Sequence, residues 1–177
     1  MSNLYVMEAA NLFCGDHDPS KSLHLQLQDL RLPTLEEIYA DHAPGGGIVD
    51  VEVAVGVSRL EAGFKLAGWN EDTISGFGIA TQQRNIFTAY GAIRNKRTGA
   101  LLEGRAVFQA RIGRIEPDAF RRGELMGHDH SLREIYHYEL HMGGKELFRW
   151  DFFENSRYQN GVNLNADINS ILRIPQA

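Results

Sequence analysis

The sequence has only one cysteine and no long apolar run. Cys14 alone cannot form a disulfide within the chain, and no segment approaches the roughly 20 apolar residues of a membrane-spanning helix. There is also no charged-then-apolar leader. We therefore expect a soluble protein, made in a reducing compartment, that does not contact a membrane. Its 177 residues, 43% of them hydrophobic, suit one compact domain over 1–177.

Positive charge is scarce in the first half of the chain. Residues 1–83 carry 12 acidic and 4 basic side chains, whereas residues 84–114 carry 7 basic side chains and 1 acidic one. The formal net charge of −5 argues against a general nucleic-acid binder. Because the charge is segregated along the chain, separate surfaces of opposite sign are expected.

Complete phosphate-binding and nucleotide-binding motifs are also missing. Residues 45–47 are three glycines without the following Lys-Ser/Thr of a phosphate loop, and Gly76-Phe77-Gly78 lacks a preceding strand and a third glycine. Cys14 has no neighbours that would activate a thiolate, which favours a buried or idle thiol. The sequence therefore predicts no catalytic residue and no cofactor-binding residue.

Two histidine patterns could suggest a metal site. His128-Asp129-His130 falls in an expected loop, where adjacent residues point apart and solvated polar side chains are the favoured interpretation. His137 and His141 would lie about 13 Å apart on a strand, too far to share one ion. No metal ligand is therefore predicted. A small metal-binding β-barrel enzyme is an alternative only if the 128–130 cluster converges with another ligand.

Residues 133–153 alternate in polarity on both sides of Gly143-Gly144, as expected for an antiparallel hairpin. A two-residue loop would mix the two faces, so we predict a three-residue loop, Gly143-Gly144-Lys145, with a bulge. This register gives an aromatic face of paired residues: Leu140 with Phe148, Tyr138 with Trp150 and Tyr136 with Phe152. It also gives a polar face of two cross-strand pairs: His137 with Asp151 and Glu139 with Arg149.

The rest of the chain is mostly strand-like. We expect strands at 4–13, 23–30, 49–55 paired with 60–69, 86–94 and 100–112. A short helix should follow Asn70, and residues 164–172 have helical spacing. Residues 42–47 and 113–131 should be long loops. The pattern predicts a mainly β, antiparallel two-sheet β-sandwich or barrel with one or two short helices and long loops.

Several short motifs follow one another in a particular order. They are residues 30–37 (LRLPTLEE), the glycine-rich loop, residues 66–69 (LAGW), Arg97-Thr98-Gly99, residues 144–147 (GKEL) and residues 160–163 (NGVN). Their order and spacing resemble those of the major tail tube protein of contractile phage tails and R-type pyocins, over nearly the whole chain.

The resemblance implies a structural protein rather than an enzyme. Hexameric rings would stack into a hollow tube inside a contractile sheath, and the sheets of six subunits would join into one inner β-barrel. DNA would pass through the lumen without sequence-specific binding. The implied partners are other copies of the chain, the tail sheath, the baseplate and the tail terminator, in a virion assembled in the host bacterial cytoplasm. A closed barrel would also remove the free strand edges that endanger a monomer.

Ring stacking could use the segregated charge. We predict that an acidic region on one ring meets a basic region of the adjoining ring, with Glu36, Glu37, Asp41 and Asp50 opposite Arg94, Lys96 and Arg97. The alternative is that both groups are solvated faces. A second alternative concerns the whole protein, because the tube protein of type VI secretion shares this architecture.

Overall fold

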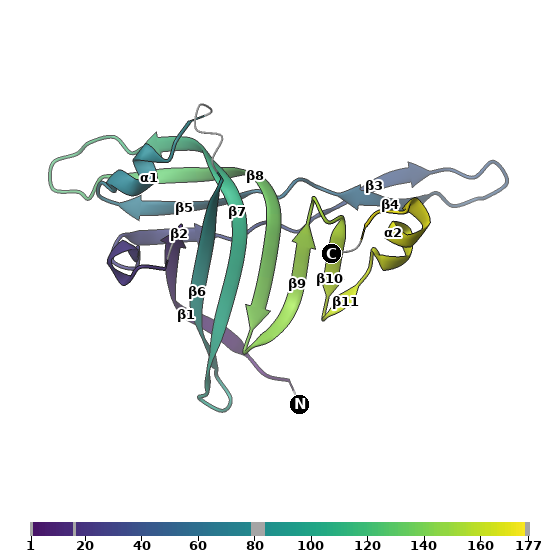
Figure 1. The fold of residues 1–177 in the computed structure, drawn as a ribbon, viewed down its shortest axis with the longest axis horizontal. Coiled ribbons are helices and arrows are strands. Elements are labelled where there is room, and N and C mark those ends of the chain that lie inside the picture. Colours follow the sequence, from purple (N-terminus) through teal and green to yellow (C-terminus); the bar gives the residue numbers. More distant parts are fainter. Residues whose placement is uncertain (1, 16, 79–83, 176–177) are drawn as a thin grey trace.

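The computed structural model describes residues 2–15, 17–78 and 84–175 (Figure 1). Within these ranges the chain forms β1 (Tyr5–Cys14), η1 (Pro19–Lys21), β2 (Leu27–Arg31), β3 (Glu37–His42), β4 (Val51–Val57), β5 (Ala62–Ala67), α1 (Glu71–Ser75), β6 (Asn85–Asn95), β7 (Leu101–Pro117), β8 (Gly127–Met142), β9 (Lys145–Asp151), β10 (Ser156–Gln159), β11 (Val162–Asn163) and α2 (Ala166–Leu172). The predicted fold class is confirmed: mainly β, two sheets and two short helices. Neither described α-helix is long and apolar enough to cross a membrane.

The main sheet is antiparallel, with the strand order β1-β6-β7-β8-β9-β10-β11. β5 pairs with the start of β8 and with β2, which gives a second layer that runs across the main sheet (Figure 1). β8 belongs to both layers, and Glu134 adopts a positive φ of 52° where its pairing changes from one layer to the other. β7 follows β8 through two register shifts, after Gln109 and after Ile112, because bulges bend a strand.

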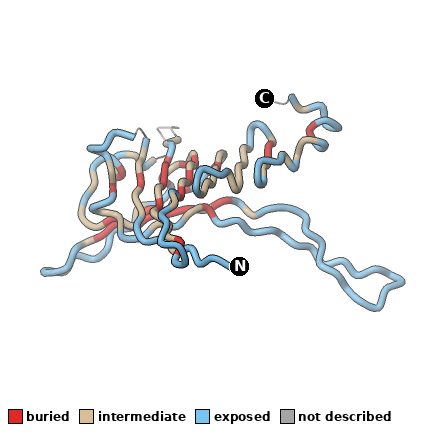
Figure 2. Tube along the Cα trace, turned by 90° about the horizontal axis from the view of Figure 1, so that it is seen from below, coloured by how far each residue is buried: buried red, intermediate tan, exposed pale blue. Residues whose placement is uncertain are grey.

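The core lies where these two layers face each other (Figure 2). The main sheet contributes Phe87 and Phe108, which stack with their ring centroids 5.6 Å apart, and Phe64 comes from β5. Small residues on the same face, such as Ala89 and Ala106, leave room for these rings. The alternating apolar residues of β6 and β7 therefore line the core face of this hairpin.

The hairpin of β8 and β9 has the predicted register through its middle, but its turn differs from the prediction. Met142 pairs with Lys145, so the loop has two residues, and Gly143 and Gly144 supply the positive φ that such a tight turn requires. A register shift at Leu147 then restores the pairing of Leu140 with Phe148. The prediction of a three-residue loop was wrong, because the extra residue, Leu147, lies inside β9 as a bulge rather than in the turn.

Strand pairing between residues 37 and 67 also differs from the prediction. β4 pairs with β3, not with β5, and β5 is instead the central strand of the second layer. Alternation shows that a segment is a strand but does not identify its partner. The strand expected over 23–30 begins only at Leu27, because a turn at 24–26 precedes it.

The long loop expected at 113–131 is much shorter. β7 runs on to Pro117 and β8 begins at Gly127, so only residues 118–126 connect them. His128 and His130 consequently lie on a strand and are buried, not solvated as predicted. They alternate with the partly exposed Asp129 and Ser131, but the mixed polarity of the segment hid this alternation.

Both predicted short helices are present. The side-chain oxygen of Asn70 accepts a hydrogen bond of 3.0 Å from the backbone N–H of Thr73, which confirms the expected cap of α1. α2 covers the predicted 164–172 region, and its buried Asn169 bonds to the side chain of Asn155 at 2.6 Å. The apolar side chains of α2 point outward, and Ile168, Ile171 and Leu172 are exposed.

Candidate assembly surfaces

The polar face of the β8–β9 hairpin is a hydrogen-bonded row of acidic and histidine side chains. The ladder places His137 opposite Asp151 and Glu139 opposite Arg149. His137 Nδ1 lies 3.0 Å from a carboxylate oxygen of Asp151. Glu139, however, bonds to His137 and His141, each at 3.1 Å, and forms neither a hydrogen bond nor an ion pair with Arg149. Arg149 instead lies 3.2 Å from Glu146 and stacks on the ring of Tyr158.

These hydrogen bonds favour the ionised carboxylates. Burial by itself would raise the pKa of Glu139, but the bonds from His141 and His137 outweigh burial and lower that pKa. The pKa of Asp151 is lowered in the same way, because backbone N–H donors and His137 outweigh its desolvation. On the opposite face of β8, burial raises the pKa of Tyr138 to about 12. The two faces of this strand therefore differ sharply in polarity.

β3 and β4 form a two-stranded ribbon that extends away from the body (Figures 1 and 2). Every residue of both strands is exposed. The register gives the ribbon one mostly apolar face, with Ile38, Ala40, Val51 and Val53 beside His42, and one mixed face, on which Glu37, Asp41 and Glu52 lie beside Tyr39 and Val57. An isolated two-stranded hairpin is at best marginally stable in water. Such a ribbon needs a surface to cover its apolar face.

The predicted stacking residues lie in two separate parts of the molecule. Glu36 directly precedes the ribbon, Glu37 and Asp41 are on β3, and Asp50 is in the ribbon tip. Arg94, Lys96 and Arg97 lie at the β6–β7 turn, at the lower end of the main sheet in Figure 1. Arg94 and Lys96 both bond to Glu8 of the same chain, at 2.8 and 2.6 Å, and lower the pKa of that carboxyl.

Each of the two edge strands of the described main sheet, β1 and β11, is paired on its inner side only. Among the described residues, β1 pairs only with β6 and β11 only with β10, so the outer edge of each has no partner strand; on β1 the carbonyl oxygen of Leu12 accepts a bond of 3.1 Å from Leu23 N–H. Such edges invite pairing with another chain. They lie on opposite sides of the subunit (Figure 1).

A groove of about 910 Å³ runs between the base of the ribbon and the main sheet. Its floor is aromatic, with Phe148, Trp150 and Phe152 on β9 and just after it. It continues the core face of the main sheet beyond the part that the second layer covers. The sequence predicted the aromatic row but not the groove, whose walls come from residues 35–60 and 133–165.

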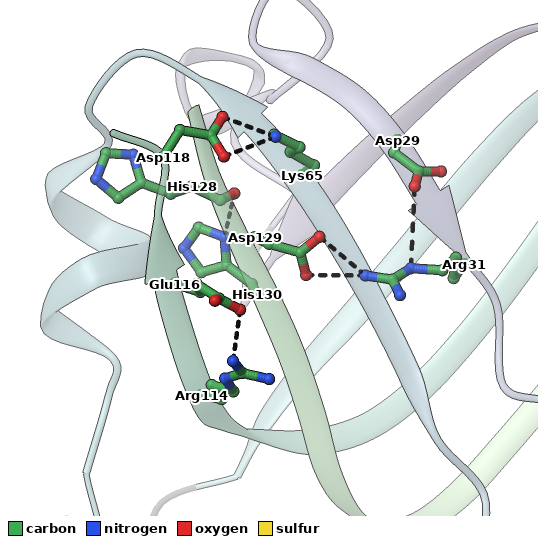
Figure 3. A network of polar contacts seen from close by, with 9 residues as sticks. All are labelled: Asp29, Arg31, Lys65, Arg114, Glu116, Asp118, His128, Asp129 and His130. Carbon is green, nitrogen blue, oxygen red and sulfur yellow. Dashed lines mark hydrogen bonds and ion pairs between the residues drawn. The ribbon is translucent and has the colours of Figure 1, made fainter. Parts of the chain in front are cut away.

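The outer face of the second layer carries a network of ion pairs (Figure 3). Arg31 bonds to Asp129 at 2.8 Å, and Lys65 lies 2.7 Å from Asp118. The Lys65 ammonium is the main cause of the lowered pKa of the Asp118 carboxyl. On the inner face, His130 Nδ1 lies 3.1 Å from the carbonyl oxygen of His128.

The described residues do not form a metal centre. No group of three or more described His, Cys, Asp or Glu side chains could hold an ion. His128 and His130 point into the core, whereas Asp129 points away from it toward Arg31 (Figure 3). Cys14 is partly buried, and burial raises its pKa to about 11, as expected of an unreactive thiol.

Comparison with known proteins shows the family of this chain. The sequence model of the family described as phage tail tube protein FII matches residues 7–172. The chain belongs to this tail tube family. The match begins within β1 and ends at the last residue of α2, so both sheets and both described helices of this tube protein lie inside it.

Solved structures share the fold of this tube protein at low sequence identity. A chain of the anti-feeding prophage baseplate matches with a TM-score of 0.56 and 12% identity, over 80% of this chain and 97% of that one. A chain of the PVC sheath-tube complex, an extracellular contractile injection system, matches with a TM-score of 0.52 and 10% identity, over 76% and 87%. A chain of the PVC sheath/tube terminator gives 0.52 and 8%, over 76% and 93%. No curated protein sequence matches significantly.

Proposed function

We propose that six copies of this chain join side by side into a closed ring, and that the rings stack into the hollow inner tube of a contractile tail. The observation that carries this proposal is the β3–β4 ribbon, whose apolar face no described part of its own chain covers. A tail tube subunit has neighbours in its own ring and in adjoining rings that would cover it. The baseplate of the anti-feeding prophage, which contains a structural relative, was described with six-fold symmetry.

Ring closure follows from the free edges of the main sheet. Pairing the edge strand β1 of one subunit with the β9–β11 side of the next would continue one sheet around the ring and remove both edges. The second layer covers one face of that sheet. The opposite face, with His137, Glu139, Arg149 and Asp151, would then line the lumen.

The role is structural, and its partners are the other parts of the tail. Sheath, terminator and baseplate are the components named with the structural relatives, and we propose the same three for this chain. In a phage the lumen would conduct DNA, without sequence-specific contacts, from a virion assembled in the bacterial cytoplasm. The type VI secretion tube remains the second candidate, and DNA inside isolated particles would exclude it.

Ring stacking through charge is part of the proposal. Glu36, Glu37, Asp41 and Asp50 would approach the β6–β7 turn of an adjoining ring, where Arg94 and Lys96 already hold Glu8. These cations would therefore be shared between the two chains. Lys96→Glu with Arg97→Glu should leave the subunit folded but lower tube yield, and raised salt should do the same to the wild type. Equal tube yield in all of these conditions would exclude charge-based stacking.

Negative-stain electron microscopy and light scattering of the purified protein test the proposal. Rings or tubes are expected for the wild type. A variant in which a short turn replaces residues 39–54 should stay folded and remain monomeric, because the deleted strands contact mainly each other. A wild-type protein that stays monomeric at high concentration, with its ribbon protected from proteolysis, would contradict the proposal.

A further inference from the structure

The loop of residues 118–126 projects from the body on the side opposite the ribbon (Figure 1, far left). Hydrogen bonds join the two ends of the loop. Asp118 N–H bonds to the carbonyl oxygen of Gly127 at 2.9 Å, and Gly127 N–H bonds back to the Asp118 carboxylate at 3.2 Å. Lys65 holds the same carboxylate (Figure 3). The loop is thus presented to the outside on a fixed base.

The tip of this loop combines apolar and cationic side chains. Phe120 and Leu125 are each 78% exposed, among the most exposed large apolar residues of the described chain. Arg121 and Arg122 lie between them, and neither forms an ion pair with any described carboxylate. An exposed aromatic ring beside unpaired arginines is the composition of an interface anchor.

The groove under the ribbon has the complementary chemistry. Its floor is Phe148, Trp150 and Phe152. Three lining residues are already paired within the chain: Arg59 and Arg133 with Glu61, and Glu134 with Arg84 and Arg111. The other charged lining residues are Glu36, Glu37 and Arg157, so the lining as a whole carries three acidic and three basic side chains, and Glu36 and Glu37 are the acidic ones that no described cation holds.

The loop and the groove lie on opposite sides of one subunit. A side-by-side ring brings the β1 side of each subunit against the β9–β11 side of the next, because its contacts are heterologous. The loop projects on the first side and the groove opens beside β9 and β10 on the second. Figure 2 places the loop and the ribbon in the same layer, below the main sheet.

We propose that the loop 118–126 of each subunit inserts into the groove of its ring neighbour, with Phe120 and Leu125 against the aromatic floor and Arg121 and Arg122 beside Glu36 and Glu37. The occupant of the groove is therefore a second copy of this chain. This contact rests on the proposed ring, and it adds a second connection between subunits besides the joined sheet edges. It also explains why large apolar residues are exposed at the loop tip.

Disulfide cross-linking tests the contact directly. In a Cys14→Ser background, Phe120→Cys combined with Phe152→Cys should give, after mild oxidation of assembled rings, a ladder of covalent oligomers up to the full ring. Phe120→Cys alone is the matched control and should stop at dimers. Rings that are visible by microscopy but give no species above the dimer in the double variant would overturn the proposal.

A charge exchange tests the pairing independently. Arg121→Glu with Arg122→Glu should lower ring yield at least tenfold while the melting temperature stays within about 2 °C, because these side chains bury little in the subunit. Adding Glu36→Lys and Glu37→Lys should restore most of the ring yield but not the tube yield, because ring stacking would use the same two carboxylates. Normal yield from the arginine variant, or no recovery in the exchange, would overturn the inference. A wild type that forms no rings would instead refute the proposed function.

Discussion

The main sheet and the β3–β4 ribbon are made of equally strand-like sequence but bury very different fractions of it. Leu12, Phe87 and Phe108 are completely buried in the main sheet, whereas all seven residues of β4 are exposed. Alternating valines in β4 pair with β3 and with no other described strand. The same strand pattern is thus buried within the subunit in one region and left exposed by it in the other.

The largest effect is expected in the body. Phe108→Ala removes a fully buried ring that stacks on Phe87 and meets Tyr138, and it should lower the free energy of unfolding by about 3–5 kcal/mol. Urea denaturation of the monomer measures this change. A loss below about 1 kcal/mol would show that the two layers do not form a tightly packed core.

The next effect is pH-dependent and also belongs to the body. Burial lowers the pKa of His130 and outweighs the opposing effect of its hydrogen bond to the backbone of His128. The unfolded chain therefore binds a proton at higher pH than the folded chain. Stability should fall as the pH drops below about 6.5, by at most about 1.4 kcal/mol per pH unit, and level off below the folded pKa. His130→Gln should be less stable at pH 7 but show a shallower slope between pH 7 and 5. An unchanged slope would assign the pH dependence to other groups.

A smaller effect is expected on the polar face of the β8–β9 hairpin. Glu139→Arg should cost about 1 kcal/mol, because it removes the acceptor of two histidines at a partly exposed position and faces Arg149 across the ladder. Exchanging the two charges, Glu139→Arg with Arg149→Glu, should recover only part of this loss. Full recovery of stability, measured by thermal unfolding, would show that the hydrogen bonds of His137 and His141 to Glu139 do not stabilise the fold.

The smallest effect on the subunit is expected in the ribbon. Val51→Ser with Val53→Ser should change the free energy of unfolding by less than about 0.5 kcal/mol, because both side chains are exposed. Tube yield should nevertheless fall tenfold or more. Ala54→Ser, on the opposite face of the ribbon, is the matched control and should assemble normally. Tubes from the valine variant at wild-type yield would mean that the apolar face is not a contact.

Local signals predicted most individual elements but not all of their partners. The Asn70 cap, the α2 spacing and the strands of the 86–112 hairpin depend on residues close in sequence, and each is present. The β8–β9 turn shows the limit. Polarity gave the correct pairing of Tyr138 with Trp150, but the bulge at Leu147 could be placed in the turn or in the strand with the same result.

The sequence by itself determined an antiparallel β protein with a polar and an aromatic face on residues 133–153, because the period of two fixes which side chains share a face. Its motifs also indicated the tail tube family. Tertiary structure alone decided that β4 leaves the body with β3, that His128 and His130 enter the core, and that residues 35–60 and 133–165 enclose a groove. These features depend on contacts between segments distant in sequence, and alternation carries no information about which distant strand or layer a segment will meet.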